Sequence, residues 1–175
     1  MWRVGLALLS LLLIAVVAGS EPSLAQAPQP GAWIADPGTS CKVWNPNPQG
    51  GETVKWSGPC VNGLAQGRGS LQWFKDNRLL EQDEGEWQGG RQTGSGTQVW
   101  QGGRYEGQLR DGEPDGHGVW TLPTGRYEGE FQNGKPNGEG KLSNANGVFE
   151  GIWTNGCFRD GTRRAYAGVP STACP

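Results

Sequence analysis

Hydrophobic and polar residues alternate along short stretches of this chain, and each stretch ends in a turn that contains glycine. From Tyr105 to Leu109, every second residue is aromatic, aliphatic or glycine, and the residues between them are polar. This period-2 pattern predicts a β-strand with one buried face. Asp111-Gly112 follows and predicts a tight hairpin turn, because both central positions of such a turn need a positive φ. Val119–Leu122 is again strand-like, so the whole segment is expected to form a β-hairpin.

The hairpin pattern recurs along the chain with a fixed step. Gly85, Gly107, Gly129 and Gly151 lie 22 residues apart. Further glycines follow the first three at the same offsets, and an earlier copy begins at Gly58, 27 residues before Gly85. A fixed period of this length indicates a repeat array, in which each unit packs on its neighbours.

Two turns occur in each repeat, at equivalent positions. The first turn is formed by Asn62-Gly63, Gly89-Gly90, Asp111-Gly112, Asn133-Gly134 and Asn155-Gly156. The second is expected at Gly102-Gly103, Thr124-Gly125 and Asn146-Gly147. Hairpins joined by such tight returns stack into one continuous sheet. The sequence therefore predicts an all-β fold, an elongated single-layer antiparallel meander of stacked β-hairpins.

Side chains at equivalent positions are expected to line up across this sheet as ladders. One ladder contains Trp56, Tyr105, Tyr127 and Phe149, with Asp83 as the odd member, and a second contains Cys60, Trp87, Leu109, Phe131 and Trp153. The repeat glycine lies between the two ladders on the same face. Glycine normally weakens a strand, so we expect it to leave room for a ring to lie flat on the backbone. The opposite face carries Glu84, Glu106, Glu128 and Glu150.

The order aromatic-Glu-Gly-x-aromatic, followed by Gly-x-x-x-Gly-x-Gly, resembles the MORN repeat family over roughly 100 residues, from Trp56 to Phe158. Residues 105–107 and 127–134 match most closely, whereas the copy at 56–58 lacks the glutamate and the copy at Gly85 lacks the aromatic residue. The resemblance implies stacked MORN-type hairpins. Repeats of this family occur in scaffolds, in membrane-junction proteins and as appendages of enzymes, so the resemblance implies binding more than chemistry.

The N-terminal residues have the features of a secretory signal peptide. Arg3 supplies a positive charge, and an apolar run at 6–18 is too short for a spanning helix. Ser23-Leu24-Ala25 fits a small-x-small cleavage site. We expect cleavage after Ala25, with a cut after Ala27 or an uncleaved anchor as alternatives. The mature chain is then exported, to the periplasm or the medium.

Four cysteines in an exported chain predict two disulfides, and three pairings are possible. Cys60 lies in the first repeat and Cys157 in the last, so an open array separates them by about 40 Å, at about 4.8 Å per strand. A disulfide needs α-carbons within about 7 Å. We therefore expect Cys41–Cys60 and Cys157–Cys174, which staple the two ends of the array and protect its edges.

These features divide the chain into four parts. Residues 1–25 are the signal peptide, 26–52 a linker and cap loop, 53–158 the repeat array, and 159–175 a C-terminal cap. Repeats are expected to begin near residues 56, 83, 105, 127 and 149. The linker at 26–35 is expected to be mobile, and prolines at 46 and 48 are expected to keep 41–48 a loop.

The sequence offers little that could carry out chemistry. Its one histidine, His117, occupies a variable turn position, and no second ligand of that kind is available. No Ser-His-Asp or Cys-His set can be assembled, and the Gly-x-Gly pairs never open a helix as a dinucleotide site requires. The net charge of −2 gives no basic stripe for nucleic acid. The sequence predicts a protein that is not an enzyme and holds no cofactor or metal.

The aromatic residues remain as candidate binding residues. The chain has eight tryptophans beyond Trp2. These rings either form the core of the sheet or line a groove that grips a sugar or a peptide. The candidate binding face consists of Trp87, Trp100, Tyr105, Trp120, Tyr127, Phe131, Phe149 and Trp153. Trp120 is expected to be structural and Trp100 exposed.

The sequence predicts a non-catalytic exported scaffold that binds another envelope protein, or a second copy of itself through a sheet edge. A glycan-binding module that uses the aromatic face is the alternative. Phospholipid binding is not favoured, because an acidic chain without a polybasic cluster gains nothing from anionic headgroups.

Overall fold

A computed structural model describes residues 31–174. The predicted signal peptide and its cleavage site lie outside the described residues. Within residues 31–174, no helix is long and apolar enough to cross a membrane.

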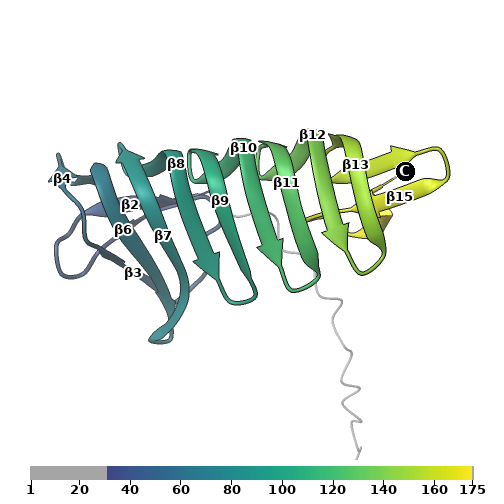
Figure 1. Cartoon of the computed structure of the whole chain (residues 1–175). Coiled ribbons are helices and arrows are strands. Elements are labelled where there is room, and N and C mark those ends of the chain that lie inside the picture. Colours follow the sequence, from purple (N-terminus) through teal and green to yellow (C-terminus); the bar gives the residue numbers. More distant parts are fainter. Residues whose placement is uncertain (1–30, 175) are drawn as a thin grey trace, which may run out of the picture.

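Eleven strands form one large antiparallel sheet in which neighbours in space are mostly neighbours in sequence. They are β3 (Glu52–Trp56), β6 (Gly67–Lys75), β7 (Arg78–Gln88), β8 (Arg91–Trp100), β9 (Gly103–Arg110), β10 (Glu113–Leu122), β11 (Gly125–Gln132), β12 (Lys135–Asn144), β13 (Gly147–Thr154), β14 (Cys157–Asp160) and β15 (Arg163–Tyr166). The predicted all-β meander is confirmed. The strands stand side by side along the molecule and the sheet does not close (Figure 1).

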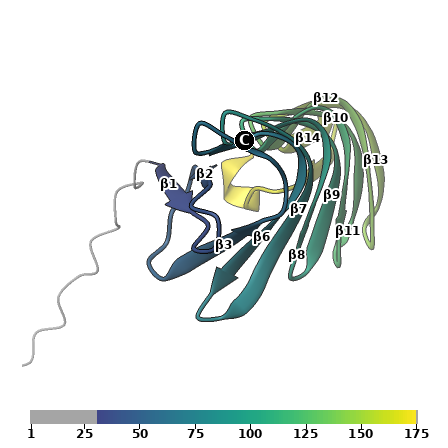
Figure 2. The ribbon, with the colours of Figure 1, turned by 90° about the vertical axis from the view of Figure 1, so that its left-hand side faces the viewer.

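Seen along the row of strands, the sheet curves into a trough (Figure 2). We call the concave side the inner face and the convex side the outer face. Both predicted ladders point to the inner face, where their rings are buried, apart from Cys60 at the N-terminal end. The four repeat glutamates are exposed on the outer face.

The first turns have the predicted backbone. Asn133 and Gly134, for example, have φ of 48° and 74°, and the other four first turns also have two positive φ values. Each first turn is also held by its neighbour. The Gly134 N–H donates to the Pro114 carbonyl at 2.9 Å, and the Gly156 N–H donates to the Pro136 carbonyl at 2.7 Å. These bonds join successive repeats along one rim of the trough.

The second turns lie one residue earlier than predicted. Trp100 pairs with Gly103, and Leu122 pairs with Gly125. The two turn residues are therefore Gln101-Gly102 and Pro123-Thr124, and the expected turn glycine is the first residue of the next strand. Gly103 is needed there because a Cβ would lie 2.5 Å from the Trp100 ring. We call this side of the trough the second-turn rim.

A row of glycines crosses the sheet from strand to strand. Its members pair directly in the order Gly69, Gly85, Gly96, Gly107, Gly118, Gly129, Gly140 and Gly151. A Cβ on Gly118 would lie 2.3 Å from the hydroxyl oxygen of Tyr105, and one on Gly140 would lie 2.1 Å from that of Tyr127. The glycine row therefore gives the ladder rings the space in which they lie against the backbone, as predicted.

Both ends of the array carry a cap, and both predicted disulfides are present. Cys41–Cys60 and Cys157–Cys174 have Cα–Cα distances of 5.8 Å and 5.5 Å. At the C-terminal end the short 3-10 helix η1 (Ser171–Ala173) is tied to β14, and the C-terminal segment lies inside the curve of the sheet (Figure 2).

The N-terminal cap differs from the expected linker and loop. β1 (Ala32–Ala35) pairs with β2 (Lys42–Asn45), and together with β4 (Cys60–Val61) and β5 (Leu64–Ala65) they form a second, four-stranded sheet. The Trp44 N–H donates to the Gly90 carbonyl at 2.8 Å, and the Asp36 carboxylate accepts from the Trp56 N–H at 2.9 Å. These long-range bonds hold strands that are too short to be stable alone. The two prolines follow β2 and stop it at Asn45.

Candidate binding surfaces on the inner face

Six of the eight candidate binding residues form the core. Trp87, Tyr105, Tyr127, Phe131, Phe149 and Trp153 are all buried. Their faces are covered by other side chains, so these six do not form an exposed aromatic groove. Trp100 and Trp120 are only half-buried and pack against the edge of the same cluster.

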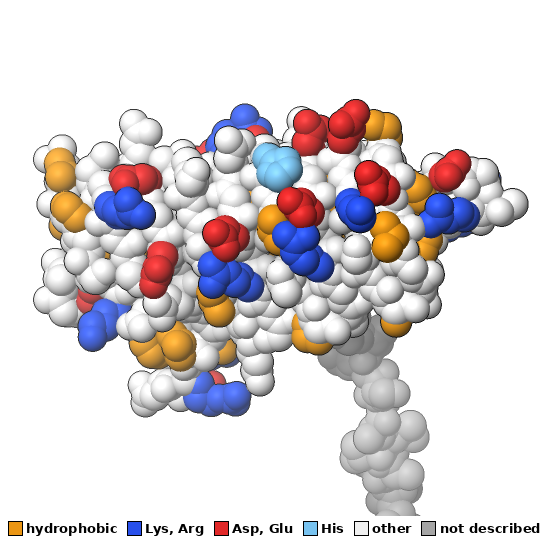
Figure 3. Space-filling view, in the orientation of Figure 1, with side chains coloured by type: hydrophobic (Ala, Val, Ile, Leu, Met, Phe, Trp, Pro, Cys, Tyr) orange, Lys and Arg blue, Asp and Glu red, His pale blue; other side chains and the backbone are white. Residues whose placement is uncertain are grey.

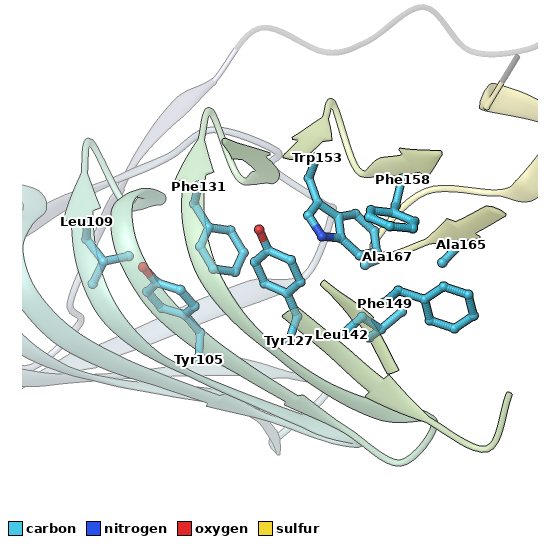
Figure 4. Packing of buried hydrophobic residues seen from close by; sticks show 10 residues of the cluster. All are labelled: Tyr105, Leu109, Tyr127, Phe131, Leu142, Phe149, Trp153, Phe158, Ala165 and Ala167. Carbon is cyan, nitrogen blue, oxygen red and sulfur yellow. The ribbon is translucent and has the colours of Figure 1, made fainter. Parts of the chain in front are cut away.

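The rings of the two ladders interlock across the glycine row (Figure 4). The Tyr127 ring lies 5.1 Å from the Phe131 ring and 5.2 Å from the Trp153 ring, both in edge-to-face contact. Its hydroxyl donates to the Glu130 carbonyl at 3.1 Å, as the Tyr105 hydroxyl does to Gln108 at 2.7 Å. Burial, and second the charge of Glu130, raise the pKa of Tyr127 to about 12. The core of the regular repeats is therefore a closed zipper of rings.

The second-turn rim carries an apolar surface that is not covered. Trp100 and Trp120 are in contact there, with ring centroids 6.3 Å apart. On one side of this pair, Leu79 and Val99 are 51% and 42% exposed and border a hollow of about 460 Å³ with Trp100. We call the line of apolar side chains along this rim the rim track; it consists of Leu79, Leu80, Val99, Trp100, Trp120, Leu122, Leu142 and Val148. Figure 3 shows hydrophobic side chains gathered at this lower rim.

On the other side of the tryptophan pair, the rim track enters a hollow of about 630 Å³ between the sheet and the C-terminal cap. Leu122, Leu142 and Phe149 line its sheet side, and Val169 and Pro170 line its cap side. The indole N–H of Trp120 is buried and has no hydrogen-bond partner. A buried donor of this kind costs free energy unless an acceptor reaches it, so this hollow suits a ligand with a carbonyl or another acceptor.

A third hollow lies at the N-terminal end of the inner face, where the aromatic ladder is interrupted by Asp83. We call it the Asp83 hollow. Its volume is about 310 Å³. Its lining includes Trp44, Trp73, Trp87, Glu52, Glu81, Asp83, Gln92, Gln98 and Asp111. The cap residues 44–49 close one side, so this hollow lies between the cap and the sheet.

Asp83 is a buried carboxylate with one unpaired oxygen. Its side chain is 5% exposed, and Oδ2 accepts from the Trp73 indole at 2.8 Å. Oδ1 has no donor while both Asp83 and Glu81 are ionised. Burial, and second the charge of Glu81, raise the pKa of Asp83 well above its usual value, and burial raises the pKa of Glu81. A proton shared by the two carboxylates would give Oδ1 a partner.

The outer face carries ion pairs in repeat register (Figure 3). Arg104 pairs with Glu106 at 2.7 Å, and 22 residues later Arg126 pairs with Glu128 at 2.6 Å. The hydrogen bond and charge of Arg126 lower the pKa of Glu128. Such exposed pairs contribute little to stability, and the glutamates are held by cations and not arranged as catalytic pairs.

The described residues hold no cluster of three or more His, Cys, Asp or Glu side chains with the geometry of a metal site. His117 is exposed beside a first turn, and each of the four cysteines is in a disulfide. The interactions that remain available on the inner face are apolar contact, ring stacking and hydrogen bonding.

Sequence reasoning missed the Asp83 hollow and the rim track. The interruption of the ladder by Asp83 was visible in the sequence, since every other member of that ladder is aromatic. The rim track was not, because its residues come from different turn-proximal positions in each repeat and share no motif.

The family model for the MORN repeat matches residues 61–78, 84–103, 105–125 and 127–148. Three of these matches begin within one residue of the predicted starts at 83, 105 and 127, and the first begins at 61 where 56 was predicted. No curated protein sequence matches the chain. The matches span more than half of the 175 residues, from 61 to 148, and coincide with the glycine row and the first turns. The chain therefore belongs to the MORN repeat family.

Proposed function

We propose that this protein is a non-catalytic, exported scaffold that binds a partner protein at the cell envelope through the rim track. MORN repeats commonly act as interaction scaffolds, and the fold presents surfaces without assembled catalytic groups. The observation that carries the proposal is the exposure of apolar side chains along one rim. Contiguous apolar surface on a soluble domain is typical of an interaction site.

The rim track fits a protein segment better than a glycan. A sugar stacks on the open face of a ring, but six of the eight candidate aromatic residues are buried. The rim instead offers aliphatic residues, Leu79, Leu80 and Val99, around one half-buried tryptophan. Aliphatic side chains of a partner would find contacts there, and a partner carbonyl would reach the unpaired Trp120 N–H.

The sheet edges are a weaker choice for self-association. β15 has four residues, and two of them are the exposed Arg163 and Arg164. Charged side chains on a short edge strand discourage pairing. At the other edge, the Asp36 carboxylate already accepts the Trp56 N–H of β3.

Export is supported by two features. Two disulfides are typical of chains that fold in an oxidising compartment. The N-terminal sequence predicts a signal peptide with cleavage after Ala25. We therefore place the protein in the periplasm or the medium.

A capture experiment with rim variants tests the proposal. Mature protein is immobilised, exposed to envelope extract and crosslinked, and isolated cell-wall glycan is tested in parallel. A stoichiometric protein partner should be captured by the wild type and lost with Leu79→Ser plus Val99→Ser. Ile152→Ser is the control, because Ile152 is 62% exposed but lies on the outer face. Equal capture by rim variant and wild type would refute the rim, and retention of glycan alone would favour the glycan alternative.

A further inference from the structure

We propose that the Asp83 hollow is a binding site for a small organic cation that carries a primary ammonium group. This site is separate from the rim track and adds a ligand class to the proposed scaffold. The proposal rests on the walls of the hollow, on its hydrogen-bonding groups and on its charge.

The walls of the hollow are aromatic on several sides. Trp44 comes from the cap, Trp73 from β6 and Trp87 from β7. Indole faces attract cations, and this corner of the protein already contains an example. The Arg91 guanidinium lies 4.4 Å from the centroid of the Trp44 ring. A volume of about 310 Å³ accommodates a small molecule but not a folded element.

The hydrogen-bonding groups of the hollow favour a ligand that donates. The Trp73 indole donates to Asp83, and the Asn45 amide donates to Glu52 at 2.8 Å. The Gln92 and Gln98 amides also donate inside the protein. The Asp83 Oδ1 acceptor is unpaired. A hydroxylated neutral ligand needs donors as well as acceptors from its site, whereas an ammonium group needs acceptors only.

The charges around the hollow are also unbalanced. Four carboxylates line it, from Glu52, Glu81, Asp83 and Asp111, and no Lys, Arg or His is among the described lining residues. The two cations near its border are engaged elsewhere, since Arg91 lies 3.8 Å from Asp111 and Lys75 donates to Gln49 at 3.3 Å. A bound ammonium group would supply the missing positive charge and a donor for Oδ1.

Binding should depend on pH. In the empty hollow, Glu81 and Asp83 share a proton because their pKa values are raised. An ammonium ligand favours the fully ionised pair and would release that proton. Affinity should therefore rise from pH 5 to pH 8. Glu52 and Asp111 add to the negative charge in this range, whereas Arg91 and Lys75 keep theirs throughout.

Calorimetric titration of the mature protein with three probes of equal length tests the site. We expect 1,5-diaminopentane to bind, and neither 1,5-pentanediol nor glutarate. Asp83→Asn should weaken diamine binding by at least about tenfold, because it removes the charge that faces the ligand. Glu84→Gln, the neighbouring residue on the outer face, removes the same charge outside the hollow and should leave binding unchanged.

Folding of each variant is verified by its thermal transition, and Glu81→Gln provides a second variant that should also weaken diamine binding. Three outcomes would overturn the proposal: no diamine binding at millimolar concentration, pentanediol binding as well as the diamine, or equal losses for Asp83→Asn and Glu84→Gln. None of these outcomes bears on the rim track, so the two proposals fail independently.

Discussion

The two ends of the inner face share one backbone frame but differ in what fills it. In the C-terminal half, the ladder position holds Tyr105, Tyr127 and Phe149, and the rings close into a continuous core. In the N-terminal half, the same position holds Trp56 and then Asp83, and a hollow remains. The glycine row and the first turns run through both halves. The frame therefore fixes the course of the sheet, and the ladder residue decides whether the interior is closed.

The longer first repeat contributes to this difference. The glycine row is crossed at Gly69 and Gly85, 16 residues apart, whereas Gly118 and Gly129 are 11 apart. The five additional residues lengthen the hairpin of β6 and β7 at the second-turn rim, with a bulge between Trp73 and Phe74. This extension, visible at the lower edge of Figure 1, supplies both Leu79 of the rim track and Trp73 of the hollow.

The largest effect is expected at the closed end of the comparison. Tyr127→Ala removes a ring that is 1% exposed and lies between Phe131 and Trp153. It should lower the free energy of unfolding by about 3–5 kcal/mol, as truncation of a core aromatic side chain does. Urea denaturation measures this loss. A loss below about 1 kcal/mol would show that the zipper of rings is not the core.

The same ladder position should give the opposite sign in the N-terminal half. Asp83→Asn removes a buried charge with an unpaired oxygen, so the variant should be more stable than wild type at pH 8 by about 1–3 kcal/mol. Because the pKa of Asp83 is raised in the folded protein, its contribution to stability is present below its usual pKa of 3.8 and is lost as pH rises. The advantage of Asp83→Asn should therefore vanish near pH 4. Thermal unfolding across pH measures it, and an advantage that grew toward low pH would contradict the assignment.

A smaller effect tests the shared frame. Gly118→Ala should cost about 1–3 kcal/mol by overpacking, since the new Cβ would press on the Tyr105 ring. Gly112→Ala has nothing within 4 Å of its Cβ and meets only the strain of φ +87°, which costs about 1–2 kcal/mol for a residue with a Cβ. Adding Tyr105→Leu should rescue Gly118→Ala in part and leave Gly112→Ala unchanged. Absence of any rescue would mean that the glycine row does not exist to seat the rings.

The repetitive features of the fold were predictable from the sequence. Spacing identified the glycine row, the first turns and both ladders, and the length of an open array identified the disulfide partners. The second turns were placed one residue late, because the glycine that follows each turn was assigned to the turn itself. In fact Gly103 is a strand residue that makes room for Trp100.

Features held by tertiary contacts were not predictable. β1 and β2 have four residues each, and they form because Trp44 and Asp36 bond to residues that are distant in the sequence. Among the candidate binding residues, burial separated Trp153 from Trp100, which the alternation of residues could not do. The Asp83 hollow depends on how the cap meets the sheet, and no local pattern specifies that contact.

The most direct test of the difference between the two halves is a single spectrum. The indole N–H resonances of the mature protein report all its tryptophans at once, and titration with 1,5-diaminopentane shows which of them face a ligand. We predict shifts for Trp44, Trp73 and Trp87 in the Asp83 hollow and none for Trp153, which is 1% exposed in the closed core. Shifts at Trp153, or no shift at any of the three hollow tryptophans, would contradict the division of the inner face into a closed core and an open site.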